Sequence, residues 1–473
     1  MTEPRTLLID GDWASAERTI DVRYPYEGRV VGAVSDADEG QALRALQAAK
    51  AYAFDLTAFE RAEILRETSA RVEAQAMDFA KSIVLESGLC LKDARREVER
   101  AVTFLRYCAE EARRLDGDAL PTDVTAEKRR SIAITMREPV GVVAAITPFN
   151  RPLNQVAVKV GPAIAAGNVV VLKPSEKTPL TAIKFVKTLI ECGLPAKAIS
   201  VLTGRPERIG NVLLKSGLVD MITFTGSSAV GKRLAEAAGM VRLLLELGDS
   251  GALIVSDDAD LVAAAKAAVA GAVSTSGQSC RGVKRVIVVD SVADAFVDRV
   301  VTGTLALRTG DPMDAESDVG CLISEEAATA VEQRVTEAVR SGAKLACGGQ
   351  RKGSQYWPTV LDRVDPKCAL VQEETFGPCA PVIRVKDFDE AIRVANDTAF
   401  GLQTGVFTAS LERAFSAIRR IKTGTVVVNN GPQFESPKIP FGGVKASGLG
   451  REGVRYAIQE MTVLKTAVFN LGT

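Results

Sequence analysis

The chain contains no histidine among its 473 residues. Neither Ser-His-Asp nor Cys-His catalysis can therefore operate, because both need an imidazole as the base. The eight cysteines form no CxxC pair, which argues against a zinc site or a dithiol redox motif. With so few ligands to draw on, the sequence predicts no metal site. Acid–base chemistry must come from carboxylates, amines or a bound cofactor.

The chain also lacks an excess of charge of either sign, with 59 Lys and Arg against 59 Asp and Glu. This balance gives no reason to expect a nucleic-acid partner or a basic membrane-binding surface. No apolar run is long enough to span a bilayer, and the first residues show no signal-peptide pattern. We expect a cytoplasmic protein of two or three domains, in which thiols stay reduced.

The order of expected helices and strands changes at Pro139. Residues 36–115 are expected to form helices, broken near Thr57 and at Ser87-Gly88. Beyond Pro139, short apolar strands alternate with helices, which predicts an α/β fold with a parallel sheet covered on both faces. The expected strands are 140–146, 168–172, 199–202, 221–225 and 242–246, and the expected helices include 153–166 and 181–192. A second strand-and-helix region follows over about 253–440.

Two further expected strands, 131–136 and 463–469, lie outside the alternating pattern. They are expected to pair with each other or with another subunit. We interpret them as an assembly arm.

Polar segments follow four of the expected strands, at 147–150, 173–176, 225–227 and 246–248. Ligands of parallel sheets bind beyond the carboxyl ends of the strands, so these segments are expected to face one crevice. The alternative is that they are turns and caps, where Pro, Gly, Ser and Asn are common for reasons of backbone geometry. Four successive segments favour the crevice.

Part of this crevice has features of a dinucleotide site. Gly226 to Gly231 opens a helix directly after a strand, and helix N-termini suit a pyrophosphate. The GxxxxG spacing is a weak signal when taken alone. Glu176, close to Lys173, is placed to accept the hydroxyls of an adenosine ribose and to repel a 2′-phosphate. This favours NAD over NADP, although the adjacent Lys177 weakens the inference.

Cys280, at the end of Ser-Gly-Gln-Ser-Cys, is the candidate nucleophile. Its attack on an aldehyde would create an oxyanion, to which the side chain of Asn150 and the Cys280 backbone N–H could donate. Loss of a hydride to a nicotinamide would leave a thioester, and Glu246 is the candidate base for its hydrolysis. The alternatives are a packed cysteine and a solvated strand-end glutamate.

Seven stretches together resemble the aldehyde dehydrogenase superfamily over essentially the whole chain. They are TPFN ending at Asn150, KPSE from Lys173, FTGS through Ser227, LELG around Glu246, GQSC ending at Cys280, EETFGP around Glu374 and PFGGVKASGLGREG from Pro440. The resemblance implies that Cys280 is the nucleophile, Glu246 the general base and Asn150 an oxyanion donor. It implies NAD, or else NADP, as the cofactor and an aldehyde as the substrate. The cofactor residues it implies are Thr147, Phe149, Lys173, Glu176, Gly226, Ser227, Val230, Glu374 and Phe376.

The resemblance also implies an organisation in three parts. A Rossmann-like cofactor domain would comprise residues 1–120 and 139–247, and an α/β catalytic domain residues 248–440. A small β oligomerisation arm would comprise residues 121–138 and 458–473. Members usually form homodimers or homotetramers, and we expect one of these states here.

The chain departs from the family pattern near the expected catalytic residues. Asp249 stands where relatives usually have a second glycine after Glu-Leu-Gly. It either tunes Glu246 or belongs to a turn, and a positive φ at this position would be tolerated by Asp less well than by Gly. Phe149 replaces a common Trp, which is a mild change.

Arg106, Arg151, Arg281 and Arg285 are candidates for an anion pocket, because guanidinium groups bind carboxylates and phosphates with two hydrogen bonds. The alternative for each is a solvated or ion-paired surface group. We therefore expect a small anionic aldehyde as the substrate.

Two other functions remain open from the sequence. A CoA-acylating dehydrogenase would use a thiol in place of water, but it would not need Glu246. A non-catalytic homologue would bind the cofactor without forming a thioester.

Overall fold

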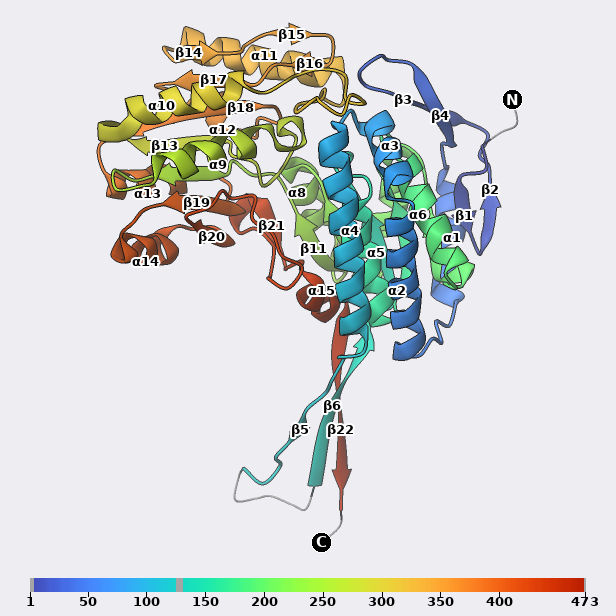
Figure 1. Ribbon diagram of the computed structural model, residues 1–473. Coiled ribbons are helices and arrows are strands. Elements are labelled where there is room, and N and C mark those ends of the chain that lie inside the picture. The colour runs from blue at the N-terminus through green and yellow to red at the C-terminus, as the bar shows by residue number, and fades with distance from the viewer. Residues whose placement is uncertain (1–3, 125–130, 472–473) are drawn as a thin grey trace.

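A computed structural model describes residues 4–124 and 131–471, and it confirms the predicted α/β class. Three larger sheets lie in different parts of the molecule (Figure 1). The expected helices and strands after Pro139 are present, with ends that differ by one or two residues. Among the described residues, no helix is both long and apolar enough to cross a membrane.

The first sheet has eight strands in the order β2-β1-β9-β8-β7-β10-β11-β21. Its five central strands run parallel. Val143 and Ala145 of β7 face one apolar core, whereas Val142 and Ala144 face another, so both faces are covered. The strands are β1 Leu7–Ile9, β2 Asp12–Ala14, β7 Val142–Ile146, β8 Val169–Lys173, β9 Ile199–Val201, β10 Met221–Thr225, β11 Arg242–Glu246 and β21 Gly448–Leu449.

The second sheet has seven strands in the order β14-β17-β18-β13-β12-β19-β20. All are parallel except β14 at one edge. The strands are β12 Ala252–Val255, β13 Arg285–Val289, β14 Lys344–Cys347, β17 Thr359–Asp362, β18 Cys379–Val385, β19 Gln403–Phe407 and β20 Thr425–Val428.

The third sheet forms a long arm that projects from the body, with the C-terminus near its tip (Figure 1). It consists of β5 Ala119–Leu120, β6 Ser131–Pro139 and β22 Thr462–Asn470. The two strands expected outside the alternating pattern pair with each other antiparallel, from Thr462 opposite Pro139 to Asn470 opposite Ser131. Residues 125–130 and 472–473 of the predicted arm, and residues 1–3 of the predicted cofactor domain, lie outside the described residues.

Helices cover the two large sheets. In the first part of the chain they are α1 Glu39–Ala51, α2 Ala58–Ala74, α3 Ala76–Ser87, α4 Leu91–Ala112, α5 Asn154–Ala166, α6 Leu180–Glu191, α7 Pro206–Lys215 and α8 Ser228–Ala237. In the second part they are α9 Leu261–Val273, α10 Asp290–Leu305, α11 Glu325–Arg340, α12 Ala369–Gln372, α13 Phe388–Asn396, α14 Leu411–Arg420 and α15 Val454–Glu460. Two small hairpins complete the fold, β3 Thr19–Arg23 with β4 Val30–Ser35, and β15 Arg351–Lys352 with β16 Gln355–Tyr356.

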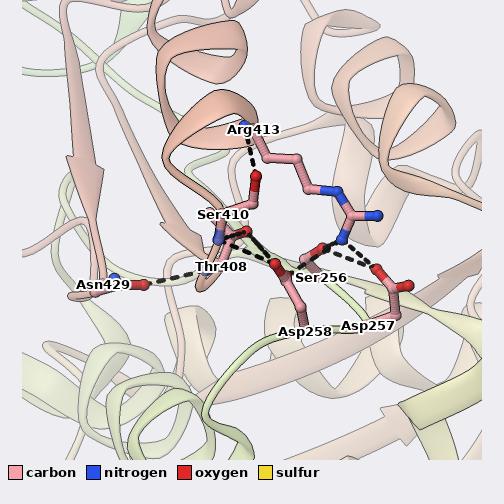
Figure 2. Close-up of polar contacts among 7 residues, drawn as sticks. All are labelled: Ser256, Asp257, Asp258, Thr408, Ser410, Arg413 and Asn429. Carbon is pink, nitrogen blue, oxygen red and sulfur yellow. Dashed lines mark hydrogen bonds and ion pairs between the residues drawn. The ribbon is translucent and has the colours of Figure 1, made fainter.

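At the carboxyl edge of the second sheet, polar contacts join the residues that follow β12 and β19 (Figure 2). Asp258, just after β12, accepts hydrogen bonds from the Thr408 hydroxyl and the Ser410 N–H that follow β19. Arg413 in the first turn of α14 pairs with Asp257 at 2.5 Å. The contacts of Ser410 and Arg413 hold the start of α14 against the residues that follow β12.

Candidate active site

A cavity of about 370 Å³ lies where the carboxyl edge of the first sheet meets the amino edge of the second. Segments that follow β7, β10 and β11 line one side. Segments that precede β13 and β18 line the other, together with α11. The expected crevice therefore exists. The first sheet lines it with the carboxyl ends of its strands, as expected, whereas the second sheet lines it with the amino ends of its strands. The lining includes Phe149, Asn150, Gly226, Ser227, Gly248, Cys280, Glu374 and Phe376.

The loop that carries Cys280 has a left-handed backbone. Thr275 and Ser276 have φ of 60° and 53°, and Gly277 follows at 74°. A Cβ on Gly277 would lie 2.0 Å from the backbone carbon of Gly377, so only glycine fits there. The buried Lys284 side chain donates to the carbonyl oxygen of Gly277 and holds this loop. Lys284 lies four residues past the nucleophile motif and was not among the predicted site residues.

The Cys280 thiol faces this cavity and is protonated at neutral pH. Burial raises its pKa to about 12; the charges of Glu246 and Glu374 also raise it, whereas those of Arg281 and Arg151 lower it. The thiolate must therefore be generated by a change in these surroundings.

We expect alkylation of Cys280 by iodoacetamide in the cofactor-free protein to be slow and steeply dependent on pH. The thiolate is the reacting form, so the rate should rise by about a factor of ten per pH unit between pH 7 and pH 10. Peptide mass spectrometry would separate Cys280 from the half-buried Cys347 and Cys368. A plateau in the Cys280 rate below pH 9 would contradict the protonated thiol.

Asn150 is placed to donate a hydrogen bond beside the thiol. It follows β7 directly and is buried, and its Nδ2 donates to the carbonyl oxygen of Gln278 at 2.9 Å. An amide NH₂ has two donors, so this bond fixes the group and leaves one N–H for an incoming oxygen. The Cys280 N–H makes no hydrogen bond within the described residues. The hydrogen bond to Gln278 therefore joins the Asn150 loop to the loop that carries Cys280, and both residues line the cavity.

A buried carboxylate caps the helix that follows Asn150. Glu97 of α4 accepts from the N–H groups of Leu153 and Asn154, at 2.8 and 3.0 Å. Burial raises its pKa to about 7. This contact fixes the first turn of α5 and, through it, the direction of the Asn150 loop.

Glu246 ends β11, is 2 % exposed, and neither of its carboxylate oxygens has a hydrogen-bond partner. Burial, and then the charge of Glu452, raise its pKa well above the usual value, while Lys159 lowers it. Lys159 donates to Glu452 at 2.7 Å and to Thr223 at 3.2 Å. This buried pair was not predicted, because Lys159 and Glu452 lie 293 positions apart.

The N-terminus of α8 suits the phosphates of a dinucleotide. Gly226 and Ser227 line the cavity, and Ser227 caps the helix by accepting from the Val230 N–H at 3.4 Å. Thr147, Lys173 and Glu176 lie at the ends of the neighbouring strands β7 and β8, outside the part of the cavity that holds Cys280. Val230 packs against the apolar core of the first sheet.

The other side of the cavity suits the nicotinamide end. The Phe149 and Phe376 rings meet edge to face at 6.0 Å. Glu374 accepts from the Asp249 N–H at 3.1 Å, and a Cβ on Gly248 would lie 2.6 Å from its other oxygen. Glycine at position 248 therefore allows Glu374 to reach into the cavity. The small residues, the helix N-terminus and this carboxylate fit an NAD(P) molecule laid across the crevice.

Two of the predicted arginines lie on the far side of Cys280, and two residues join them that the sequence analysis missed. Arg281 pairs with Glu435 at 2.6 Å, and Arg100 of α4 approaches the same carboxylate at 3.5 Å. Arg151 is buried nearby and donates to the Thr275 hydroxyl at 2.9 Å. We call Arg100, Arg151 and Arg281 the arginine cluster.

The structure does not bring Arg106 or Arg285 to this cluster. Arg106 is half-exposed and pairs with Glu73 of α2 at 2.5 Å. Six residues along a helix turn a side chain about 120° away, so Arg100 and not Arg106 faces the site. Arg285 is buried against the backbone carbonyls of Ser250, Val394 and Ala395, where it has a structural role.

Asp249 belongs to a structural contact rather than to the Glu246 environment. Its carboxylate accepts from the N–H groups of Leu402 and Gln403, at 3.2 and 3.3 Å. Its φ is not positive, so the position does not require glycine. The structure shows no turn at Asp249; its carboxylate instead binds the backbone at the start of β19.

Comparison with known proteins agrees with this geometry. The model of the Aldehyde dehydrogenase family matches residues 13–467. The chain is 40% identical over 466 residues to a 3-sulfolactaldehyde dehydrogenase of Priestia aryabhattai, and the match covers 98% of both chains.

Two solved structures share the whole architecture. One is a glyceraldehyde-3-phosphate dehydrogenase from Methanocaldococcus jannaschii complexed with NADP, with a TM-score of 0.92 and 37% identity over 96% of this chain and 100% of that one. The other is aldehyde dehydrogenase 21 from Physcomitrella patens in complex with the reaction product succinate. Its TM-score is 0.96 and its identity 33%, over 100% of both chains.

Proposed function

Because the chain belongs to the aldehyde dehydrogenase family, we propose that Cys280, Glu246 and Asn150 catalyse the oxidation of a small anionic aldehyde. Family membership makes the protein an oxidoreductase that acts on aldehydes with NAD(P)⁺. The identity of the aldehyde and the roles of single residues are the proposal. One observation carries the anionic substrate: Arg100, Arg151 and Arg281 gather around the Glu435 carboxylate, and none of the three lines the cofactor cavity.

The first step is attack of the Cys280 thiolate on the aldehyde carbon, which forms a C–S bond and leaves the negative charge on oxygen. The free N–H of Asn150 and the Cys280 N–H donate to that oxyanion. When bound, NAD(P)⁺ would supply the acceptor for a hydride. Loss of that hydride from the former aldehyde carbon leaves a thioester on Cys280. Thr147, Phe149, Lys173, Glu176, Gly226, Ser227, Val230, Glu374 and Phe376 are the residues proposed to hold the cofactor.

The second step is hydrolysis of the thioester. Glu246 takes a proton from water, the hydroxide adds to the acyl carbon, and the C–S bond breaks to give the carboxylate and the Cys280 thiol. A raised pKa suits a base that works near neutral pH. The buried Lys159–Glu452 pair adjusts this pKa, because the lysine lowers it and Glu452 raises it. Retention of a buried Glu246 next to the cavity argues against the CoA-acylating alternative.

The arginine cluster supports an acid group on the substrate. Arg151 and Arg281 are buried, and they lower the pKa of Cys280, so they act on the same space as the reacting carbon. By their names, one of the relatives described above acts on a sulfonate-bearing aldehyde and another on a phosphorylated aldehyde. The third is in complex with a dicarboxylate product, succinate. Carboxylate, sulfonate and phosphate all suit guanidinium donors.

A panel of propanal, succinate semialdehyde and glyceraldehyde 3-phosphate tests this proposal. We expect a pre-steady-state burst of NADH with at least one anionic aldehyde, at a kcat/KM about 10²-fold above that of propanal. Such a ratio corresponds to about 3 kcal/mol, which is within reach of a buried charge-assisted contact. Faster turnover of propanal than of either anion would refute an anionic substrate.

We propose NAD rather than NADP as the preferred cofactor. Lys173 is buried at the end of β8, and the charges of Glu176, Glu207 and Asp36 act on it. A 2′-phosphate bound near Lys173 would meet these carboxylates. The same panel run with both cofactors decides the question, because a higher kcat/KM with NADP would refute the preference.

We propose that the β5-β6-β22 arm joins subunits in a homodimer or homotetramer, beside a cofactor domain of residues 1–120 and 139–247 and a catalytic domain of residues 248–440. The arm projects from the body and exposes Leu464, Val468 and Phe469. Apolar side chains on an exposed strand suit a subunit contact. A monomeric mass by light scattering would refute assembly.

We also propose a cytoplasmic location, since all eight cysteines are free. Cell fractionation tests this location.

A further inference from the structure

The arginine cluster holds an internal anion, Glu435. Arg281 donates from Nη2 to Glu435 at 2.6 Å, and Arg100 lies 3.5 Å from the same oxygen. Burial by itself raises the pKa of Glu435, but the charges of Arg281, Arg100 and Arg151 outweigh it and lower the pKa to about 2. Glu435 is therefore ionised at neutral pH.

Glu435 does not satisfy every hydrogen-bond donor of the cluster. Burial, and then repulsion from Arg151, lower the pKa of Arg100 to about 10. Arg281 is 6% exposed, yet its Nη1 has no hydrogen-bond acceptor. Buried donors are almost always paired, so an unpaired guanidinium nitrogen indicates a place where a ligand atom is expected.

Space for a ligand lies beside the cluster. A cavity of about 310 Å³ is lined by Arg100, Glu435 and Asn154, with Phe104 and Pro437 as its apolar walls. Arg100 also borders a second cavity of about 300 Å³, which Arg151 lines. A molecule in the first cavity thus reaches Arg100 and the Glu435 carboxylate that pairs with Arg281, and a molecule in the second reaches Arg100 and Arg151.

We propose that Glu435 is a specificity-determining residue that competes with the substrate's acid group for Arg281 and Arg100. This proposal rests on the proposed oxidation of an anionic aldehyde. In the free enzyme the Glu435 carboxylate occupies these guanidinium groups, and an incoming acid group must share them. Oxidation adds a second negative charge to the molecule, so the charge of Glu435 also weakens retention of the product.

The test compares Glu435→Gln with the wild type and with Glu99→Gln. Glu99 lines the same cavity, but its exposed side chain makes no contact with the arginine cluster, so it is a matched removal of charge. We expect Glu435→Gln to raise the ratio of kcat/KM for succinate semialdehyde over propanal about tenfold or more, because a nearby like charge is lost. The inhibition constant of inorganic sulfate, measured against propanal, should fall by a similar factor. Glu99→Gln should leave both quantities within about twofold.

Other outcomes overturn the proposal. A lower ratio, or an unchanged sulfate inhibition constant, would mean that Glu435 positions Arg281 rather than competing for it. Arg100→Gln provides a second variant if Glu435→Gln does not fold: it should weaken sulfate inhibition about tenfold, and unchanged inhibition would again refute competition. A wild type that prefers propanal would instead refute the anionic substrate, while the sulfate comparison would still decide the role of Glu435.

Discussion

Replacing Cys280 with serine is expected to abolish the NADH burst and to lower kcat by about 10⁴-fold or more. A serine hydroxyl is a far weaker nucleophile than a thiolate, and the chain offers no histidine to deprotonate it. The cavity would be unchanged, because the two side chains differ by one atom. Stopped-flow absorbance of NADH with the best aldehyde of the panel measures the effect.

Cys368→Ser is the matched control for this variant. Cys368 is half-buried and precedes α12, away from the cavity, so the same exchange there should leave the burst intact. Cys280→Ser should also bind NAD with wild-type affinity, which separates lost chemistry from lost folding. A burst that survived in Cys280→Ser would exclude the covalent mechanism.

Replacing Glu246 with glutamine should separate the two chemical steps. The first turnover does not need the base, so an NADH burst of one equivalent per site should remain. Steady-state kcat should fall by about 10²- to 10⁴-fold, the usual contribution of a general base. Mass spectrometry of the protein during turnover should show an acyl group on Cys280. Hydroxylamine, which cleaves thioesters without a base, should restore much of the rate.

The pH dependence gives an independent check of Glu246. Burial raises the pKa of this carboxyl, and a general base is active only when it is deprotonated. Steady-state kcat of the wild type should therefore rise with pH through this raised pKa and then level off. Glutamine does not titrate, so this rise should be lost in the variant. Loss of the burst together with the steady-state rate would contradict a role limited to hydrolysis.

Much of the fold and the catalytic centre could be predicted because the relevant signals are local. The apolar strands β7, β8, β10 and β11 are each followed at once by polar residues, and parallel strands place their carboxyl ends together. Asn150 and Glu246 therefore had to share one edge of a sheet. The motif around Cys280 predicts the nucleophile, and the absence of histidine favours a carboxylate as the base.

The substrate side could be predicted only in part, because it depends on helix phase and on contacts distant in sequence. Arg106 has the right residue type, but it lies on the face of α4 that meets Glu73. Arg100 faces the site, and no local pattern separates the two. Glu435 lies 154 positions from Arg281, in a loop without a motif of its own.

The sequence by itself determined the α/β class and the family, and it predicts Cys280, Glu246 and Asn150 as nucleophile, base and amide donor from residue type and short spacing. Only the tertiary structure decided where the second sheet stands. Its strands present their amino ends to the crevice, so Cys280 and Glu374 meet the carboxyl ends of the first sheet. The tertiary structure also brings together the buried ion pair of Lys159 and Glu452, and it places Arg281 against Glu435. Both contacts form because side chains far apart in the sequence are buried against each other. Tertiary packing, and not the local order of residues, determines which side chains these are.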